Sequence, residues 1–359
     1  MARAASGMTV IEHTPPRIRW YRCRVSREDL SRLNRRSNLL GLAQTLGFLL
    51  LLGSTAAAAH YSFHNWPWYA TVAIAFVHGT FWRFLVNGFH ELVHKSVFRT
   101  PWLNGLFVRI FAFLSWNNPH WFWASHTEHH KYTLHQPDDL EVVLPTKITL
   151  GSFLLSAFVD VRWLYHTLRT NLLRCLGVVN PSKDPWTAHL FPETVPQQRR
   201  ALVRWSRTLV LGHGLIVAGS LYMGWWMVPV VVTLAPAYGG WLHFLLNNSQ
   251  HAGLADKTPD YRLCCRTLYL NPFLQFLYWH MNYHTEHHMF PAVPCYNLPR
   301  LHRLIRHDMP PCPRGIIRTW RQIIGILRRQ KVDPTYQYVA PLPPPAAASA
   351  PGDAVPGVN

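Results

Sequence analysis

The chain has 359 residues, of which 49% are hydrophobic and only 14% are charged, well below the roughly one quarter of a typical soluble domain. Its formal net charge is +18, which suits the cytosolic face of a membrane protein. The usual nucleic-acid recognition modules are missing, so we expect no nucleic-acid partner. The 6 cysteines show no CxxC spacing, which argues against a disulfide framework or a zinc site.

The chain begins with a basic arm, residues 1–36, which has no apolar stretch long enough for a signal peptide. The composition then changes sharply, because residues 37–82 contain no Asp, Glu, Lys or Arg. A membrane span needs about 20 apolar residues, so this stretch is long enough for two spans. We expect a helical hairpin built from residues 39–59 and 67–89.

A second charge-free stretch covers residues 208–255 and predicts another hairpin. Its two helices should be residues 208–222 and 227–246, with a turn near Gly224. Two shorter apolar segments, residues 103–116 and 148–159, are typical of interfacial helices. Residues 341–359 are rich in Pro and Ala and predict a disordered tail.

The distribution of charge predicts how the four spans are oriented. The turns of both hairpins lack Lys and Arg, whereas the N-terminal arm, residues 95–207 and the C-terminal region are basic. Because positive residues stay on the cytosolic side, both termini should be cytosolic. The predicted fold is an all-α integral membrane protein, with four transmembrane helices and a cytosolic helical cap, forming one domain over residues 37–340.

Histidine is the most unusual feature of the composition, with 22 residues against 17 Asp and Glu together. Three clusters stand out: HELVH at residues 90–94, and HTEHH at residues 126–130 and again at residues 284–288. Positions i, i+3 and i+4 share a helical face, so each cluster presents its imidazoles together. Scattered surface histidines would not repeat this spacing three times on one predicted side of the membrane. The candidate metal ligands are His90, His94, His126, His129, His130, His284, His287 and His288.

These eight imidazoles predict two metal ions, because a single iron accepts about six ligands. Glu128 and Glu286 lie roughly 200° around the helix from the first histidine of their own box. They should therefore not bind the same metal from that box. We expect each to accept the outer ring N–H of a ligand histidine from another segment.

This arrangement resembles the membrane fatty acid desaturase superfamily. The resemblance rests on the two hairpins, on HELVH after the second span, and on one HTEHH motif before and one after the second hairpin. It covers residues 39–307. It implies a mushroom-shaped helical fold, two iron ions held by the boxes, and O2 as co-substrate. In acyl-CoA desaturases an Asn and a His four residues later also serve the metals, which makes Asn247 and His251 further candidate ligands.

Two departures from the family pattern bear on the reaction. The first box is HxxxH, whereas stearoyl-CoA desaturases have HxxxxH, and the text HELVHK is similar to the HELGHK of alkane hydroxylases. The sequence also contains no HPGG-type cytochrome b5 domain. Electrons would therefore come from a separate protein of the ferredoxin, rubredoxin or cytochrome b5 type.

We expect desaturation of a fatty acyl chain or a related lipid. A methylene has no acidic proton and no leaving group, so acid–base catalysis alone cannot oxidise it, whereas iron with O2 can. A membrane hydroxylase is the nearer alternative, because substrate placement decides between an alkene and an alcohol. A metal-binding transporter is the more distant alternative. Transporter sites usually lie near the bilayer midplane, whereas these histidines should lie at the cytosolic ends of the spans. The aromatic run at residues 116–123 fits either a substrate tunnel or an interfacial belt.

Overall fold

The computed structural model describes residues 15–144 and 148–344. All regular elements in these residues are helical, and the β-type pairings are isolated bridges, so the all-α prediction is confirmed for this part of the chain. The helices are α1 (Arg27–Leu33), α2 (Asn38–Asn65), α3 (Trp68–Trp82), α4 (Leu85–Val93), α5 (Pro101–Leu114), α6 (Pro119–Tyr132), α7 (Leu150–Ala157), α8 (Val161–Cys175), α9 (Pro185–Leu190), α10 (Pro196–Tyr222), η1 (Pro229–Thr233), η2 (Ala235–Ala237), α11 (Trp241–Asn248), α12 (Tyr261–Cys264), α13 (Pro272–Leu277), α14 (His284–Met289), η3 (Cys295–Asn297), α15 (Leu298–Ile305), η4 (Arg306–Asp308) and α16 (Gly315–Val332).

The first predicted hairpin consists of α2 and α3, which pack against each other. The side chain of Ser37 caps α2 by accepting a hydrogen bond from Leu40 N. α2 runs six residues past the predicted end at residue 59, because nothing before Pro67 interrupts it. α3 continues, after a short break at Arg83, into α4, which carries the first histidine box.

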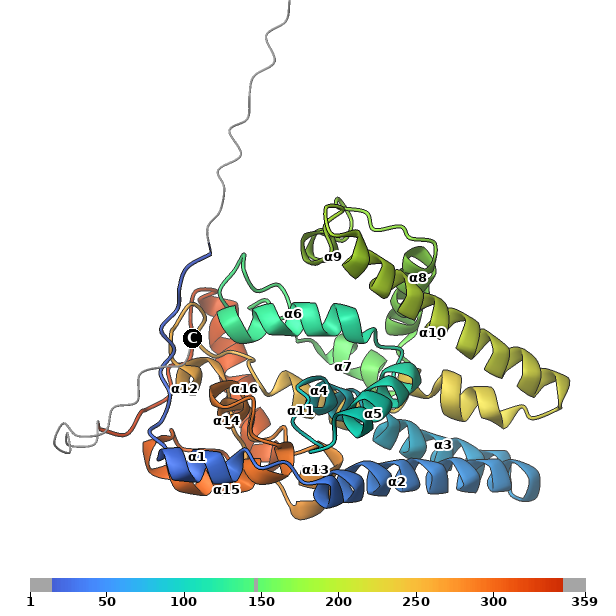
Figure 1. Cartoon of the computed structure of the whole chain (residues 1–359). Coiled ribbons are helices and arrows are strands. Elements are labelled where there is room, and N and C mark those ends of the chain that lie inside the picture. The colour runs from blue at the N-terminus through green and yellow to red at the C-terminus, as the bar shows by residue number, and fades with distance from the viewer. Residues whose placement is uncertain (1–14, 145–147, 345–359) are drawn as a thin grey trace, which may run out of the picture.

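Two segments of the described chain are long and apolar enough to cross a membrane, α2 and the combined α3–α4 stretch. Their apolar side chains face outward, as do those of the second half of α10. Leu50 in α2, Trp68 in α3 and Leu215 in α10 are 70%, 76% and 74% exposed. Apolar surface of this extent suits hydrocarbon better than water. In Figure 1 these three helices extend together to one side of the molecule, away from α1, α12 and α14–α16.

The second predicted hairpin is only partly regular. α10 ends just before the predicted turn at Gly224, whose φ is +74°. The predicted last span, residues 227–246, is divided into η1, η2 and the short α11. Pro229 and Pro236 lack the N–H that a continuous helix needs. At Gly239, with φ +68°, a Cβ would lie 2.7 Å from a backbone oxygen of α3, so a close backbone contact replaces the expected continuous helix.

The described part of the N-terminal arm packs onto the end of the molecule opposite the long apolar helices. The ring of Trp20 stacks on Tyr261 with centroids 4.1 Å apart, and Tyr21 O–H donates to Asp308 at 2.5 Å. Cys23 is buried among these contacts. The two short apolar segments are helices as expected, α5 and α7. Residues 1–14 and the predicted tail beyond residue 344 lie outside the described residues.

Candidate metal centre

Nine histidines from four segments meet at one buried centre between α4, α6 and α14. α6 is fixed at its start by Asn118, whose side chain accepts hydrogen bonds from the backbone N–H groups of His120 and Trp121, and by Pro119 in its first turn. The turn that follows α11 contributes the ninth ring, His251, which belongs to none of the three boxes.

The nine rings divide into two groups. Within each group the ligand atoms, one per residue, all lie within 4.8 Å of one another. The first group contains His90, His94, His126, His130 and His287. The second group contains His129, His251, His284 and His288. The structure therefore offers two adjacent places for a metal ion, and His251 belongs to the second.

Each HTEHH box serves both groups. In α6 the i and i+4 residues, His126 and His130, join the first group, while His129 joins the second. In α14 the assignment is reversed, because His284 and His288 join the second group and His287 joins the first. On a helix the i+3 position lies about 60° to one side of position i, and the i+4 position about 40° to the other. The three histidines of each HTEHH box, which the sequence predicted to lie on one helical face, are therefore divided between two neighbouring groups.

Two carboxylates from the loop after α6 hold outer ring nitrogens of the box. His126 Nδ1 lies 2.7 Å from Glu141, and His129 Nδ1 lies 2.8 Å from the fully buried Asp139. Carboxylates accept, so each of these rings carries its proton on Nδ1 and turns the lone pair of Nε2 toward the centre.

Two further contacts act in the same way at the other ligand segments. His90 Nδ1 lies 3.1 Å from Glu91, a buried carboxylate within the first box. His251 Nδ1 donates to the carbonyl oxygen of Cys264 at 2.8 Å. A carbonyl can only accept, so the Nε2 atom of a neutral His251 ring carries a lone pair. This Nε2 lies 2.8 Å from Nε2 of His284.

The arrangement fits a pair of bound cations. Four pairs of Nε2 atoms lie 2.8 to 3.2 Å apart, which is also the separation expected for two imidazoles that bind the same cation. Burial lowers the pKa of His251 to about 3 and holds the pKa of His288 well below its usual value, so these rings are neutral and ready to ligate. Among the nine rings of the centre, the buried nitrogens without a hydrogen-bond partner are His90 Nε2, His94 Nε2, His130 Nδ1, His284 Nδ1 and His287 Nδ1.

The prediction for Glu128 needs a correction. Its side chain pairs with Lys131 at 2.8 Å and lines the large cavity beside the centre, and it forms no hydrogen bond or ion pair with a histidine of the two groups. The carboxylates that do form such contacts, Asp139 and Glu141, were missed by the motif search because they lie in a loop. Their signal was an acidic run, residues 138–141, close to a histidine box in a chain with only 17 acidic residues.

Glu286 does contact a histidine of another segment, but this histidine, His302, is not part of either histidine group. The buried carboxylate accepts from Thr267 O–H at 2.5 Å and contacts the Nδ1 atom of His302. His302 in turn lies 2.8 Å, through Nε2, from the hydroxyl of Tyr269. Glu286 therefore links α14 to α15, and its predicted contact with a metal-ligand ring is not present.

Asn247 is also placed apart from the centre. It is exposed on α11 and lines a different cavity, together with Arg83 and His243. The helical spacing on which its prediction depended is lost, because α11 ends at Asn248 and a turn follows. His251 reaches the centre by that turn, and Asn247 does not.

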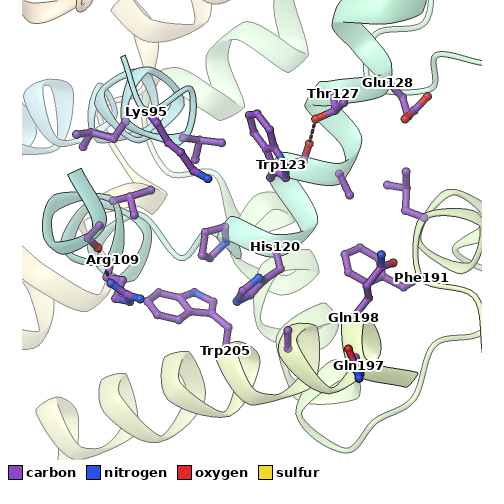
Figure 2. A pocket seen from close by; sticks show the side chains of 18 of the residues that line it. Lys95, Arg109, His120, Trp123, Thr127, Glu128, Phe191, Gln197, Gln198 and Trp205 are labelled. Carbon is purple, nitrogen blue, oxygen red and sulfur yellow. Dashed lines mark hydrogen bonds between the residues drawn. The ribbon is translucent and has the colours of Figure 1, made fainter. Parts of the chain in front are cut away.

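A cavity of about 900 Å³ lies beside the centre, between α4, α5, α6, α9 and α10. Figure 2 shows Trp123 of α6 on one wall, with His120 and Trp205 on the opposite side. The Trp123 ring also contacts His94, with centroids 6.3 Å apart, so it separates the cavity from the first histidine group. The charged side chains of its lining are Lys95, Arg109 and the single carboxylate Glu128.

Residues 65–320 match the fatty acid desaturase family over most of the length of the chain. The chain belongs to this family. It is similar to the sphingolipid delta(4)-desaturase DES1-like of Arabidopsis thaliana, with 28% identity over 255 residues, which is 70% of this chain and 66% of that protein. It is also similar to the sphingolipid delta(4)-desaturase of Komagataella phaffii, with 28% identity over 245 residues, 66% of this chain and 61% of that protein.

A human relative, sphingolipid delta(4)-desaturase/C4-monooxygenase DES2, is 26% identical over 253 residues, which is 67% of this chain and 66% of that protein. The matched part spans slightly less than two thirds of each of these three relatives. The expected superfamily is thereby confirmed.

Proposed function

We propose that this protein is a membrane-bound, O2-dependent lipid desaturase that holds two iron ions in its two histidine groups. The observation that carries the proposal is the division of nine histidines into adjacent groups of five and four. Relatives whose names describe sphingolipid desaturation support a lipid substrate. Imidazole-rich sites with no thiolate suit iron, and the family supplies the reason to choose iron over zinc or copper.

Two irons, when bound, supply the reduction of O2 and the oxidation of a C–H bond, which side chains alone cannot perform. The residues of the chain hold and insulate that chemistry. Asp139, Glu141 and the carbonyl of Cys264 fix the orientation of three ligand rings. Burial of the histidines excludes water, which protects reactive species from side reactions. Electrons come from a separate ferredoxin, rubredoxin or cytochrome b5 type protein.

The 900 Å³ cavity is the substrate site in this proposal. Part of its apolar lining comes from α4 and α6, the same helices that carry the first two histidine boxes. An alkyl chain lying against Leu92, Val93 and Trp123 would approach the first histidine group beside His94. The cationic residues Lys95 and Arg109 would face the polar end of the lipid.

We also propose four membrane crossings with both termini in the cytosol. The outward apolar faces of α2, α3 and α10 support three of them. η1, η2 and α11 together would provide the fourth, as a broken segment packed against α3. Non-helical backbone at membrane depth is tolerated where protein covers it.

A hydroxylase is the second candidate. The HELVHK text favours it, and the human relative carries both activities in its name. Both reactions begin at the same kind of C–H bond, and the position of the substrate relative to the metals decides which follows.

Iron content and O2 use test the proposal. Protein purified in detergent and loaded with ferrous iron should hold close to two irons per chain. It should consume O2 only in the presence of a lipid substrate and a reductant, and a chelator should abolish both properties. His64→Ala, at the exposed end of α2, is the matched control and should keep both. An active preparation that holds a single zinc and no iron would refute the assignment.

A further inference from the structure

Two adjoining cavities lie away from the metal centre and share Arg83 and His243 in their walls. The smaller, about 170 Å³, has three tryptophans in its wall, Trp82, Trp116 and Trp163. The larger, about 350 Å³, lies between α7, α11 and the start of α8. Nothing in the proposed reaction uses this pair of cavities, which we call the Arg83 cavities.

Arg83 is the charged residue at the break between α3 and α4, within the second apolar segment. One of its amino groups donates to the carbonyl oxygen of Pro236 at 2.5 Å, and its guanidinium lies 5.6 Å from the ring centroid of Trp163. No carboxylate of the described residues is in direct contact with it, and Asp160 of the same cavity wall acts on its charge from a greater distance. An arginine at membrane depth is costly, so a place with this much unused donor capacity favours an anionic ligand.

The larger cavity adds further donors around Arg83. Arg162, Asn247 and Asn248 line it, and the buried Nε2 atom of His243 has no hydrogen-bond partner. Asp160 is the single carboxylate among the described lining residues. Its side chain already accepts from a backbone N–H at the start of α8. Two guanidinium groups against one engaged carboxylate leave a net positive cavity.

The surface next to this cavity is apolar. Val161, Tyr165, Leu168 and Leu172 follow one another at positions i, i+4, i+7 and i+11 of α8 and are 39 to 69% exposed. Phe158, immediately before α8, is 61% exposed. A helix with an exposed apolar stripe beside cationic residues is typical of the lipid–water interface. The stripe begins at Val161, next to Arg162 in the chain. A cationic group that could bind a lipid head group therefore adjoins an apolar surface that could contact acyl chains.

We propose that the Arg83 cavities bind an anionic membrane lipid. Its phosphate would lie between Arg83 and Arg162, and its acyl chains would lie along the apolar stripe of α8. The occupant is a lipid and not a free anion, because the apolar stripe begins at Val161, between Asp160 and Arg162 of the cavity wall, and three tryptophans line the smaller cavity. The site is separate from the cavity beside His94 and does not depend on the reaction that the metal centre performs.

Native mass spectrometry of the full-length protein tests this site directly. The protein, in detergent, is offered equal amounts of phosphatidylglycerol and phosphatidylcholine with identical acyl chains. We expect the wild type to retain one phosphatidylglycerol in preference to phosphatidylcholine. Arg83→Gln and Arg162→Gln should each lower that retention by about tenfold, the usual effect of losing a hydrogen bond to a charged group. Arg169→Gln, an exposed arginine of α8 that lines neither cavity, removes the same charge and should have no effect.

Four results would overturn the proposal. The first is equal retention of both lipids by the wild type. The second is an unchanged preference in Arg162→Gln, an exposed position at which a folding defect is not expected. The third is equal loss in Arg169→Gln, since the preference would then come from general surface charge. The fourth is displacement of the bound lipid by inorganic phosphate at matched concentration. We expect no displacement, because displacement would identify a soluble anion as the ligand of this site.

Discussion

His251 is the candidate ligand that lies outside the three histidine boxes, and it was predicted through the resemblance to acyl-CoA desaturases. It reaches the second histidine group through a turn, with its Nδ1 proton held by a backbone carbonyl. His251→Ala would leave this group three imidazoles while the first keeps five. We expect iron content to fall from close to two per chain to close to one, with loss of turnover. Elemental analysis against His64→Ala checks this, and full iron loading in His251→Ala would exclude the ninth ligand.

Asp139 is the residue that we expect to matter most among those that do not touch a metal. It is fully buried, lies 2.8 Å from His129 Nδ1 and accepts a hydrogen bond from Leu134 N at 2.8 Å. Asp139→Asn removes the negative charge that holds His129, so iron affinity should fall by about 10- to 100-fold. Chelator competition measures this. Glu193→Gln, an exposed acid, should bind iron as the wild type does, and equal affinity in Asp139→Asn would show that the carboxylate does not support the ligand.

Single residues also show how far a sequence can predict such a site. The eight box histidines could be predicted because their helical spacing repeats in the sequence. Asp139 and Glu141 could not, because a loop brings them back onto α6 and no periodicity describes a loop. Asn247 shows the opposite error, in which helical spacing was extended beyond the residue where the helix ends.

At the scale of elements, α6 has two functional faces. One carries the box histidines, and the neighbouring face, with Trp123, Ala124 and Thr127, lines the 900 Å³ cavity. Ala124→Trp would fill part of the cavity without touching a ligand. We expect a large loss of lipid oxidation with close to two irons still bound, measured as turnover per bound iron. Gly214→Trp on α10, where a Cβ meets open space, is the control. Normal turnover in Ala124→Trp would place the substrate elsewhere.

The elements that sequence patterning predicted well are those with strong local signals. α2 and α3 follow from the absence of charge and from Pro67, and α5 and α7 from short apolar runs. The last predicted span, residues 227–246, does not form one helix. Its two prolines and Gly239 were visible in the sequence, yet the break depends on a close contact with α3, which hydropathy does not report.

For the whole molecule, the proposed topology makes a direct prediction. A cysteine introduced by Asn65→Cys, at the end of α2, should react with a membrane-impermeant thiol reagent applied to the non-cytosolic side of the membrane. Lys131→Cys, beside the second box, should react only after the membrane is permeabilised. The wild type, with its own cysteines, sets the background in both cases. External labelling of Lys131→Cys would contradict the cytosolic placement of the metal centre.

The most direct measurement compares lipids extracted from cells that express the wild type or His284→Ala. His284 belongs to the second histidine group, so its loss should stop oxidation while the protein still inserts. Mass spectrometry should reveal, in the wild type alone, a lipid lighter than its precursor by two hydrogen atoms and free of oxygen from isotopically labelled O2. A product that contains the labelled oxygen, with no alkene, or lipids identical in both strains, would contradict a lipid desaturase.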